Sequence, residues 1–265
     1  EIYTLSLHDA LPICQVTKGP LLFVHGASHG AWCWEKYLQY FSKNGFDCYA
    51  LSLRGHGKSA GFENLNSYGL NDYVNDILAT IKKLSIKPIL IGHSIGGVLT
   101  QKIIKNHPDK IKAAVILSPV PLKKMGLFWV VKLLLRDFIG GKTAISIFLG
   151  KKVTMKQLKN ASFINNRISD KDLTRYAPLF KAESKKALRE MLEPRSSKRQ
   201  KPKLPVCLIG SKADKLFPCS DQTELGKAYD KQTILLTNVC HDIMLDIEWE
   251  KGAREILKFI RRENL

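Results

Sequence analysis

A serine flanked by glycines, between an apolar run and a helical pattern, constrains this fold more than any other feature of the chain. Residues 92–96 (GHSIG) follow the apolar run 88–91 and precede apolar residues with helical spacing up to about Asn106. We expect a buried strand, a sharp turn and a helix, with the hydroxyl of Ser94 exposed at the apex of the turn. Glycine suits both flanking positions because a side chain would clash in so tight a turn. Short patterns of this kind recur by chance, so Ser94 is either a nucleophile or an ordinary serine in a glycine turn.

Short apolar runs alternate with amphipathic helical patterns along most of the chain. We expect strands at residues 21–24, 48–53, 88–91, 112–117, 205–209 and 232–236. We expect helices at 32–41 and 73–84, from just after Ser94 to about 106, and at 220–229 and 249–260. Strands that alternate with helices favour a mainly parallel sheet with helices on both faces, so the predicted fold class is α/β.

Residues 121–203 interrupt this alternation. The segment is typical of several helices without a convincing strand, and it ends in a polar, basic, proline-flanked linker from 194 to 203. We therefore predict an α/β core made of residues 14–120 and 204–265. The segment 121–203 is predicted to be a helical lid over the carboxyl edge of the sheet.

The positive charge of the chain is concentrated in this predicted lid. The chain carries a formal net charge of +18. Residues 121–203 contain 21 Lys and Arg against 6 Asp and Glu, a net charge of +15. The lid is either a solvated, lysine-rich face or a surface that attracts an anionic membrane or an acidic substrate. We expect no nucleic-acid partner, because no recognised binding module accompanies the charge.

Cysteine usage and hydropathy argue for a globular chain in a reducing compartment. The six cysteines show no C-x-x-C pair and no metal-like spacing, so we expect free thiols and a cytoplasmic location: Cys14, Cys33, Cys48, Cys207, Cys219 and Cys240. No apolar run approaches the roughly 18 residues of a membrane-spanning helix.

The first thirteen residues, EIYTLSLHDALPI, resemble the translation of a widely used sequencing-adapter oligonucleotide in one reading frame. We expect residues 1–13 to be a non-native artefact, so they are left out of the fold prediction, and His8 and Asp9 are given no role. A signal peptide at the native start stays an open question.

The residues that could activate Ser94 occur in a recognisable order. A serine hydroxyl is a weak nucleophile without a base, and the base needs an acid to orient it. His241 lies in a loop between the last predicted strand and the last helix, and Asp214 lies just beyond a strand. The order Ser94, Asp214, His241 is a known arrangement of such triads. Asp242 and Asp246 are rival acids, although Asp242 is poorly placed to orient its own sequence neighbour.

Six further histidines compete with His241 for the role of base. His8 falls in the segment 1–13, whereas His25 and His56 lie in turn motifs, where histidines commonly hold loops by hydrogen bonds. His93 adjoins Ser94 but is expected to point elsewhere. His29 and His107 have no motif support beyond a turn and a helix end.

The developing oxyanion needs backbone N–H donors. One belongs to the residue after the nucleophile, Ile95, and the other to the loop after His25-Gly26, where Ala27 is the candidate.

Five segments carry a family resemblance: LLFVHGASHGAWCW, ALSLRGHGKS, LIGHSIGG, GSKAD and CHDIMLD. They resemble the α/β-hydrolase superfamily, in particular its bacterial esterase-like members, and the first is also similar to plant methylesterases and hydroxynitrile lyases. The resemblance covers residues 21–260 apart from the lid. It implies a serine hydrolase without a metal or an organic cofactor. Many members carry an antiparallel hairpin before the strand at 21–24, and whether it was lost here stays open.

Two residues depart from common patterns in the superfamily. Cys240 stands where glycine often precedes the base, and Asp242 stands where hydroxynitrile lyases carry lysine, which argues against lyase chemistry. Serine at position 94, in place of aspartate, argues against epoxide hydrolase and haloalkane dehalogenase activity.

We predict hydrolysis of carboxylic esters, with a small-molecule or lipid ester as the substrate. One alternative is a lysophospholipase or monoacylglycerol lipase that contacts a membrane through the apolar stretch 127–135 of the basic lid. These apolar residues could instead pack over an acyl pocket. Thioesterase or perhydrolase activity, and a ligand receptor built on a hydrolase scaffold, are further alternatives.

Overall fold

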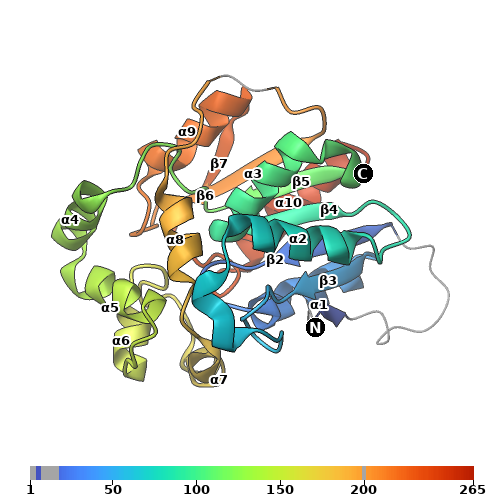
Figure 1. The fold of residues 1–265 in the computed structure, drawn as a ribbon. Helices are drawn as coiled ribbons and strands as arrows, with labels where there is room; N and C mark the ends of the chain where they lie inside the picture. The colour runs from blue at the N-terminus through green and yellow to red at the C-terminus, as the bar shows by residue number, and fades with distance from the viewer. Residues whose placement is uncertain (1–3, 7–17, 199–200) are drawn as a thin grey trace.

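A mainly parallel β-sheet forms the centre of the molecule (Figure 1). The computed structural model describes residues 4–6, 18–198 and 201–265. Within these residues the strand order is β1-β3-β2-β4-β5-β6-β7. The strands are β1 (Thr4–Ser6), β2 (Pro20–Val24), β3 (Asp47–Leu51), β4 (Ile89–His93), β5 (Ala113–Leu117), β6 (Val206–Ser211) and β7 (Thr233–Leu236). Strands β2 to β7 pair in parallel, and only β1 runs antiparallel to its neighbour β3.

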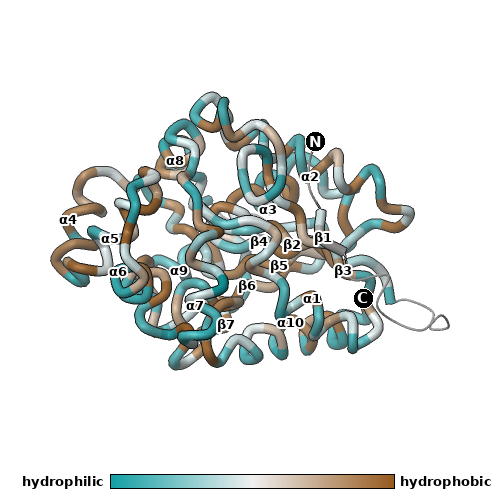
Figure 2. The backbone as a smooth tube through the Cα atoms, turned by 90° about the horizontal axis from the view of Figure 1, so that it is seen from below, coloured by the Kyte–Doolittle hydropathy of each residue, from teal (hydrophilic) through white to brown (hydrophobic). Residues whose placement is uncertain are grey.

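Helices cover both faces of this sheet. The core helices are α1 (Glu35–Lys43), α2 (Leu70–Ile81), α3 (Ile95–Asn106), α9 (Cys219–Tyr229) and α10 (Glu250–Arg262). Short 3-10 helices lie at η2 (Ala31–Trp34), η3 (Phe62–Ser67), η4 (Pro108–Lys110) and η5 (Ala177–Leu179). Helices α1 and α10 lie on one face of the sheet, and α2 and α3 lie on the other (Figure 2). The predicted α/β fold class is confirmed.

An aromatic cluster attaches α1 to the sheet. The ring of Phe23 in β2 lies 5.1 Å from that of Trp34, 6.3 Å from that of Tyr37 and 5.8 Å from that of Phe41. All four side chains are buried. Since full burial of a large apolar side chain contributes about 1.5–3 kcal/mol, this cluster fixes the strand that leads into the Ala27 loop.

The predicted elements are correct in type, and their ends differ by a few residues. Every residue of β4 and β5 is buried, as expected for strands covered on both faces. The helix expected at 73–84 spans Leu70–Ile81. It begins earlier because the Asp72 carboxylate accepts a hydrogen bond from the Gly69 N–H at 2.8 Å.

The interval between β5 and β6 contains helices and no strand among its described residues. The helices are α4 (Leu127–Arg136), α5 (Phe138–Phe148), α6 (Met155–Asn160), α7 (Asp170–Tyr176) and α8 (Lys185–Leu192). We call residues 118–205 the helical insertion. Helix α4 lies at its outer end, away from the sheet (Figure 1). The helical content agrees with the prediction, whereas its action as a lid stays a prediction.

Only residues 4–6 of the predicted artefact are described. They form β1, which pairs with β3 at the edge of the sheet, with Thr4 opposite Leu51. This pairing is a backbone interaction and does not test where the segment originates. His8, Asp9 and Cys14 lie outside the described residues.

The remaining five cysteines are free thiols, in line with the sequence prediction: Cys33, Cys48, Cys207, Cys219 and Cys240. None of the helices in the described part of the chain has the length and apolar character of a membrane span.

Candidate active site

Ser94 lies at a strained turn between β4 and α3. Its backbone has φ +52° and ψ −116°, a conformation that costs a non-glycine residue about 1–3 kcal/mol. The N–H of Ser94 donates to the carbonyl oxygen of Leu117 at 3.0 Å, which ties the turn to the end of β5. Contrary to the prediction, the side chain is only 7% exposed. Phe148 and Phe163 of the helical insertion cover the cavity that it faces.

Close backbone packing around this turn accounts for two of the glycines. A Cβ atom on Gly96 would lie 2.5 Å from the carbonyl oxygen of Val24 and 2.7 Å from that of His25. A Cβ atom on Gly26 would lie 2.5 Å from Nδ1 of His93. Glycine therefore lets α3 and the loop after β2 approach each other, which brings that loop beside Ser94.

His241 and Asp214 form a buried hydrogen-bonded pair. Nδ1 of His241 donates to Oδ2 of Asp214 at 2.7 Å. The other oxygen, Oδ1, accepts from the backbone N–H groups of Leu216 at 2.7 Å and Phe217 at 2.8 Å. Burial alone would lower the pKa of His241, but the charge of Asp214 and its hydrogen bond hold this pKa above its ordinary value, with a further contribution from Asp242.

The structure brings the predicted site residues to one place. Ala27, Ser94 and His241 line a shared cavity of about 10 Å³. Ile95 is the first residue of α3, where helical N–H groups lack an intrahelical acceptor. Asp214 lies behind His241, on the side of Nδ1.

The two rival acids have other partners. Asp242 pairs with Nε2 of His29 at 3.1 Å, and it lies 3.6 Å from Nε2 of His93. Asp246 accepts from the N–H of Cys240 at 2.7 Å and from Nε of Arg167 at 2.7 Å. Burial alone would raise the pKa of Asp242, but His29, His93 and His241 hold it below its ordinary value.

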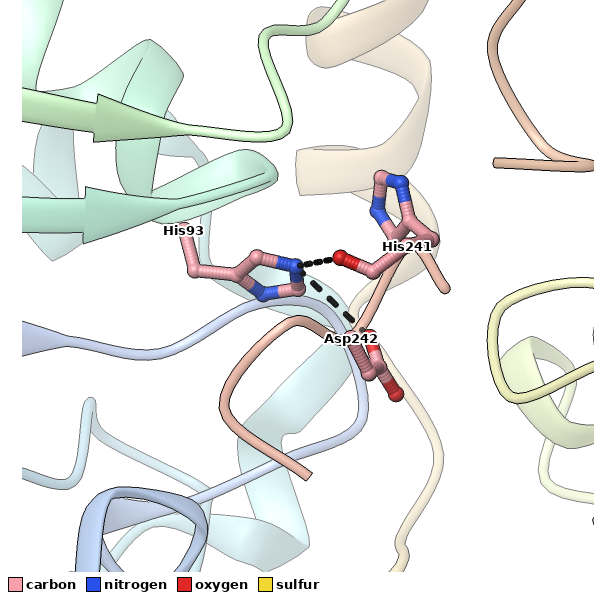
Figure 3. A group of neighbouring side chains, drawn as sticks. All are labelled: His93, His241 and Asp242. Atoms are coloured by element: carbon pink, nitrogen blue, oxygen red, sulfur yellow. Dashed lines mark hydrogen bonds and ion pairs between the residues drawn. The ribbon is translucent and has the colours of Figure 1, made fainter. Parts of the chain in front are cut away.

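His93 and His29 have positions that the sequence did not predict. Both line the cavity of Ser94, although His93 was expected to point elsewhere. Nε2 of His93 donates to the carbonyl oxygen of His241 at 3.0 Å and so holds the loop of the base (Figure 3). Nδ1 of His29 donates to the carbonyl oxygen of Ala27 at 2.6 Å. With Asp242 between them, these rings join the Ala27 loop to the His241 loop. No sequence pattern predicts contacts between residues that lie so far apart in the chain.

The cluster in Figure 3 is better suited to hydrogen bonding than to holding a metal. One ligand atom each from His93, His241 and Asp242 lie within 4.8 Å of one another. Nε2 of His93, however, faces a carbonyl oxygen and a carboxylate, so it carries a proton and offers no lone pair. Nδ1 of His241 is already occupied by Asp214. These contacts orient the base instead.

Comparison with known proteins places this geometry in a family. Residues 15–248 match the family model Hydrolase_4, described as serine aminopeptidase, S33. The chain belongs to this family of α/β-hydrolases. The solved structures share the fold of this chain, and the matches differ in the share of each protein that they cover.

One relative in sequence is a putative chloroplastic methylesterase 11 of Arabidopsis thaliana, 32% identical over 121 residues. That match covers 44% of this chain and only 30% of the relative. A crystal structure of a monoacylglycerol lipase from Paleococcus ferrophilus has a TM-score of 0.71 and 25% identity, and covers 98% of both chains. A methylesterase structure from Arabidopsis has a TM-score of 0.69 at 22% identity, covering 91% of this chain and 98% of that one. The last likeness shows the fold alone.

A buried carboxylate from the helical insertion supports the Ala27 loop, and sequence reasoning missed it. Glu183 is 1% exposed, and its Oε2 accepts from the N–H of Ser28 at 3.3 Å and lies 3.1 Å from Nε2 of His56. Its Oε1 accepts from the hydroxyl of Tyr73 at 2.9 Å. The carbonyl oxygen of Ser28 accepts from the N–H of Lys181 at 3.1 Å. Ser28 has φ +66°, so the insertion holds a strained residue next to Ala27 from both sides.

Mutual attraction shifts the pKa values of Glu183 and His56 in opposite directions. Burial alone would raise the pKa of Glu183 and lower that of His56. The two groups instead hold the pKa of Glu183 below and that of His56 above its ordinary value. No sequence pattern indicated this role for Glu183, because Ser28, His56 and Tyr73 all lie more than a hundred residues away in the chain.

The pH profile of this hydrolase tests the electrostatic role of Asp242. A base acts only when neutral, so kcat/KM is expected to fall as the pH drops through the pKa of His241, above the ordinary histidine value. Asp242→Asn removes a charge that raises this pKa, so the acid limb of kcat/KM should move to lower pH. Asp109→Asn, an exposed carboxylate beside Lys110, is the control and should leave the limb in place. An acid limb unchanged by Asp242→Asn, or moved to higher pH, would contradict this account.

Proposed function

We propose that this chain hydrolyses carboxylic esters, with Ser94 as nucleophile, His241 as general base and acid, and Asp214 as the residue that orients His241. The observation that carries the proposal is the Asp214–His241 pair, whose imidazole faces the same cavity as Ser94. Since Nδ1 of His241 donates to Asp214, Nε2 holds the lone pair that can accept the proton of Ser94.

The reaction follows from these positions in two halves. Oγ of Ser94 bonds to the ester carbonyl carbon while its proton passes to Nε2 of His241. The carbon–oxygen bond to the alcohol then breaks, and His241 gives the proton to the departing alkoxide. A water molecule next attacks the acyl carbon while His241 takes its proton. The bond between that carbon and Oγ of Ser94 then breaks, His241 returns the proton to Oγ, and the carboxylic acid is released. The N–H groups of Ala27 and Ile95 stabilise the oxyanion in both halves, and losing one such donor costs about 10²–10³ in rate.

The relatives support esters as the substrate class. A methylesterase and a monoacylglycerol lipase are named for two different esters, and both are similar to this chain. The chain matches less than a third of the length of the methylesterase, so the alcohol and the acyl group do not follow from that relative. A thioesterase would use the same triad, and a ligand receptor on this scaffold would bind without rapid turnover.

Substitution of the nucleophile tests the reaction. Ser94→Ala is expected to lower the hydrolysis of 4-nitrophenyl acetate and octanoate by at least about 10³-fold, because the remaining site only binds and polarises the ester. Ser67→Ala, which removes an exposed hydroxyl that donates to the Asn64 carbonyl oxygen, is the matched control and should retain full activity.

Two results would overturn the proposal. Hydrolysis that survives Ser94→Ala would exclude Ser94 as the nucleophile. Stoichiometric binding without repeated turnover by the unmodified chain would favour a receptor.

We infer further that the basic insertion contacts anionic membrane surfaces. The first two helices of the insertion expose six large apolar side chains, each between 43% and 83% accessible: Leu127, Phe128, Val131, Leu135, Phe138 and Ile139. In the stretch 127–135, Leu133 is buried and Trp129 packs on Phe217 at 5.9 Å. The alternative that the whole stretch packs over an acyl pocket is therefore less favoured. Helix α4, whose backbone carries hydrophobic colouring over most of its length, lies at the outer end of the molecule (Figure 2).

Three exposed lysines accompany this apolar surface: Lys124, Lys132 and Lys142. Lys123 is instead paired with Asp221 and Glu224, and Arg136 donates to the carbonyl oxygen of Leu216. Apolar residues combined with lysine and arginine favour the interface of an anionic bilayer, where both kinds of side chain find a partner. A lipid ester would then be drawn from that surface.

Sedimentation with vesicles tests this contact. The chain is expected to sediment with vesicles that contain phosphatidylglycerol and to stay in solution with phosphatidylcholine vesicles, and added salt should weaken the binding. Leu135→Asp should reduce the bound fraction, whereas Ile86→Asp, at an exposed apolar residue outside the insertion, should not. Equal binding to both vesicle types, or binding to neither, would exclude the membrane contact.

A further inference from the structure

The cavity beside Ser94 is too small for an ester. Its volume of about 10 Å³ is enough for about one water molecule. Phe148 and Phe163 of the helical insertion form part of its wall. An acyl chain therefore needs space beyond this wall.

A larger cavity is lined mostly by residues of the insertion. Its volume of about 530 Å³ falls within the range of small-molecule sites. Ile147, Leu158 and Phe180 contribute apolar side chains to its lining, together with Phe62 from the core.

Phe180, which lines the large cavity, packs against two residues that line the small one, His29 and Phe163. The ring of Phe180, which lines the large cavity, lies 4.8 Å from that of His29, which lines the small one. Phe163 stacks on Phe180 at 5.9 Å and on Phe148 at 5.9 Å. Ile147 lines the large cavity, and its neighbour Phe148 lines the small one. Packed aromatic side chains therefore separate the two cavities, and these rings would have to rotate for the cavities to connect.

The polar part of the large cavity is cationic. Its lining includes Lys151, Lys152 and Lys181 and no Asp or Glu. Nζ of Lys181 donates to the carbonyl oxygen of Gly57 at 3.1 Å and lies 5.2 Å from the centre of the Phe62 ring. The side chains of Lys151 and Lys152 are exposed at the rim. An apolar chamber with lysines at its rim fits an apolar chain that ends in a carboxylate or a phosphate.

We propose that the large cavity is the acyl subsite and that it selects acyl chains with an anionic end, which Lys151 and Lys152 bind. The ester carbonyl lies at Ser94, the chain passes Phe180, and the anionic end reaches the rim. This inference rests on the proposed ester hydrolysis, since it names the substrate class of that reaction.

Binding to the Ser94→Ala variant tests the cavity without turnover, so a failure here is separate from a failure of the hydrolysis. Sodium octanoate, titrated calorimetrically, is expected to bind about 5–10-fold more weakly when Lys151→Ala and Lys152→Ala are added. Lys82→Ala with Lys83→Ala, which removes two exposed charges outside the cavity, is the matched control and should leave the Kd within about 2-fold. Octyl phosphate in the same titrations shows whether the carboxylate or the phosphate binds more tightly.

Two results would overturn the subsite. One is that octanoate and octyl phosphate bind to the Lys151→Ala/Lys152→Ala variant with unchanged affinity. The other is an equal loss in the Lys82/Lys83 control, which would indicate general attraction to a cationic surface.

The aromatic wall is tested by turnover in the otherwise unmodified chain. Phe180→Ala is expected to raise the ratio of kcat/KM for 4-nitrophenyl octanoate over acetate by at least about 5-fold, because the longer chain gains access to the large cavity. A ratio that stays constant or falls would show that the acyl chain does not pass Phe180.

Discussion

Two backbone N–H groups and the imidazole of His241 converge on the carboxylate of Asp214. The amides of Leu216 and Phe217 fix the carboxylate, the carboxylate fixes Nδ1 of the base, and Nε2 is thereby left to accept a proton. Ser94 can act as a nucleophile only if this chain of contacts holds. Its strained backbone adds to the arrangement, because the turn aims the hydroxyl at the shared cavity instead of into the sheet.

Hydrogen bonds hold the loop that carries His241 as well as the His241 ring. The carbonyl oxygen of His241 accepts from Nε2 of His93 at 3.0 Å and from Oγ of Ser118 at 2.6 Å, so the ends of β4 and β5 both position it. Asp242 connects the same loop to His29 and thus to the Ala27 loop. Ser94, His241 and the Ala27 loop therefore share one hydrogen-bonded frame, in which the loss of one contact affects the others.

The helical insertion both completes this site and encloses it. Glu183 and Lys181 hold Ser28 beside the candidate oxyanion donor, while Phe148 and Phe163 close the space above Ser94. A buried ion pair such as Glu183–His56 adds little net stability but is costly to break, so it favours one fixed position of this segment.

Local patterns in the sequence were enough to predict strands β2 to β7 and the core helices, and they named the candidate triad residues that the structure brings together. Each depends on short-range signals: apolar runs, helical spacing, a glycine turn, and polar residues just after strands. The contacts that depend on the insertion could not be predicted in this way. Glu183 meets Ser28 across 155 residues, and neither its neighbours nor its spacing marks it as buried. The exposure of α4 could not be predicted either, because an apolar helix is as typical of a buried core as of an outer surface.

The central claim is that His241 activates Ser94, and covalent labelling tests it most directly. A fluorophosphonate probe, followed by mass spectrometry of the intact chain and its peptides, is expected to add one phosphonyl group, on Ser94. His241→Ala should slow this labelling by at least about 10³-fold, because the hydroxyl then has no base. Labelling at another residue, or labelling of Ser94 at an unchanged rate without His241, would contradict the account.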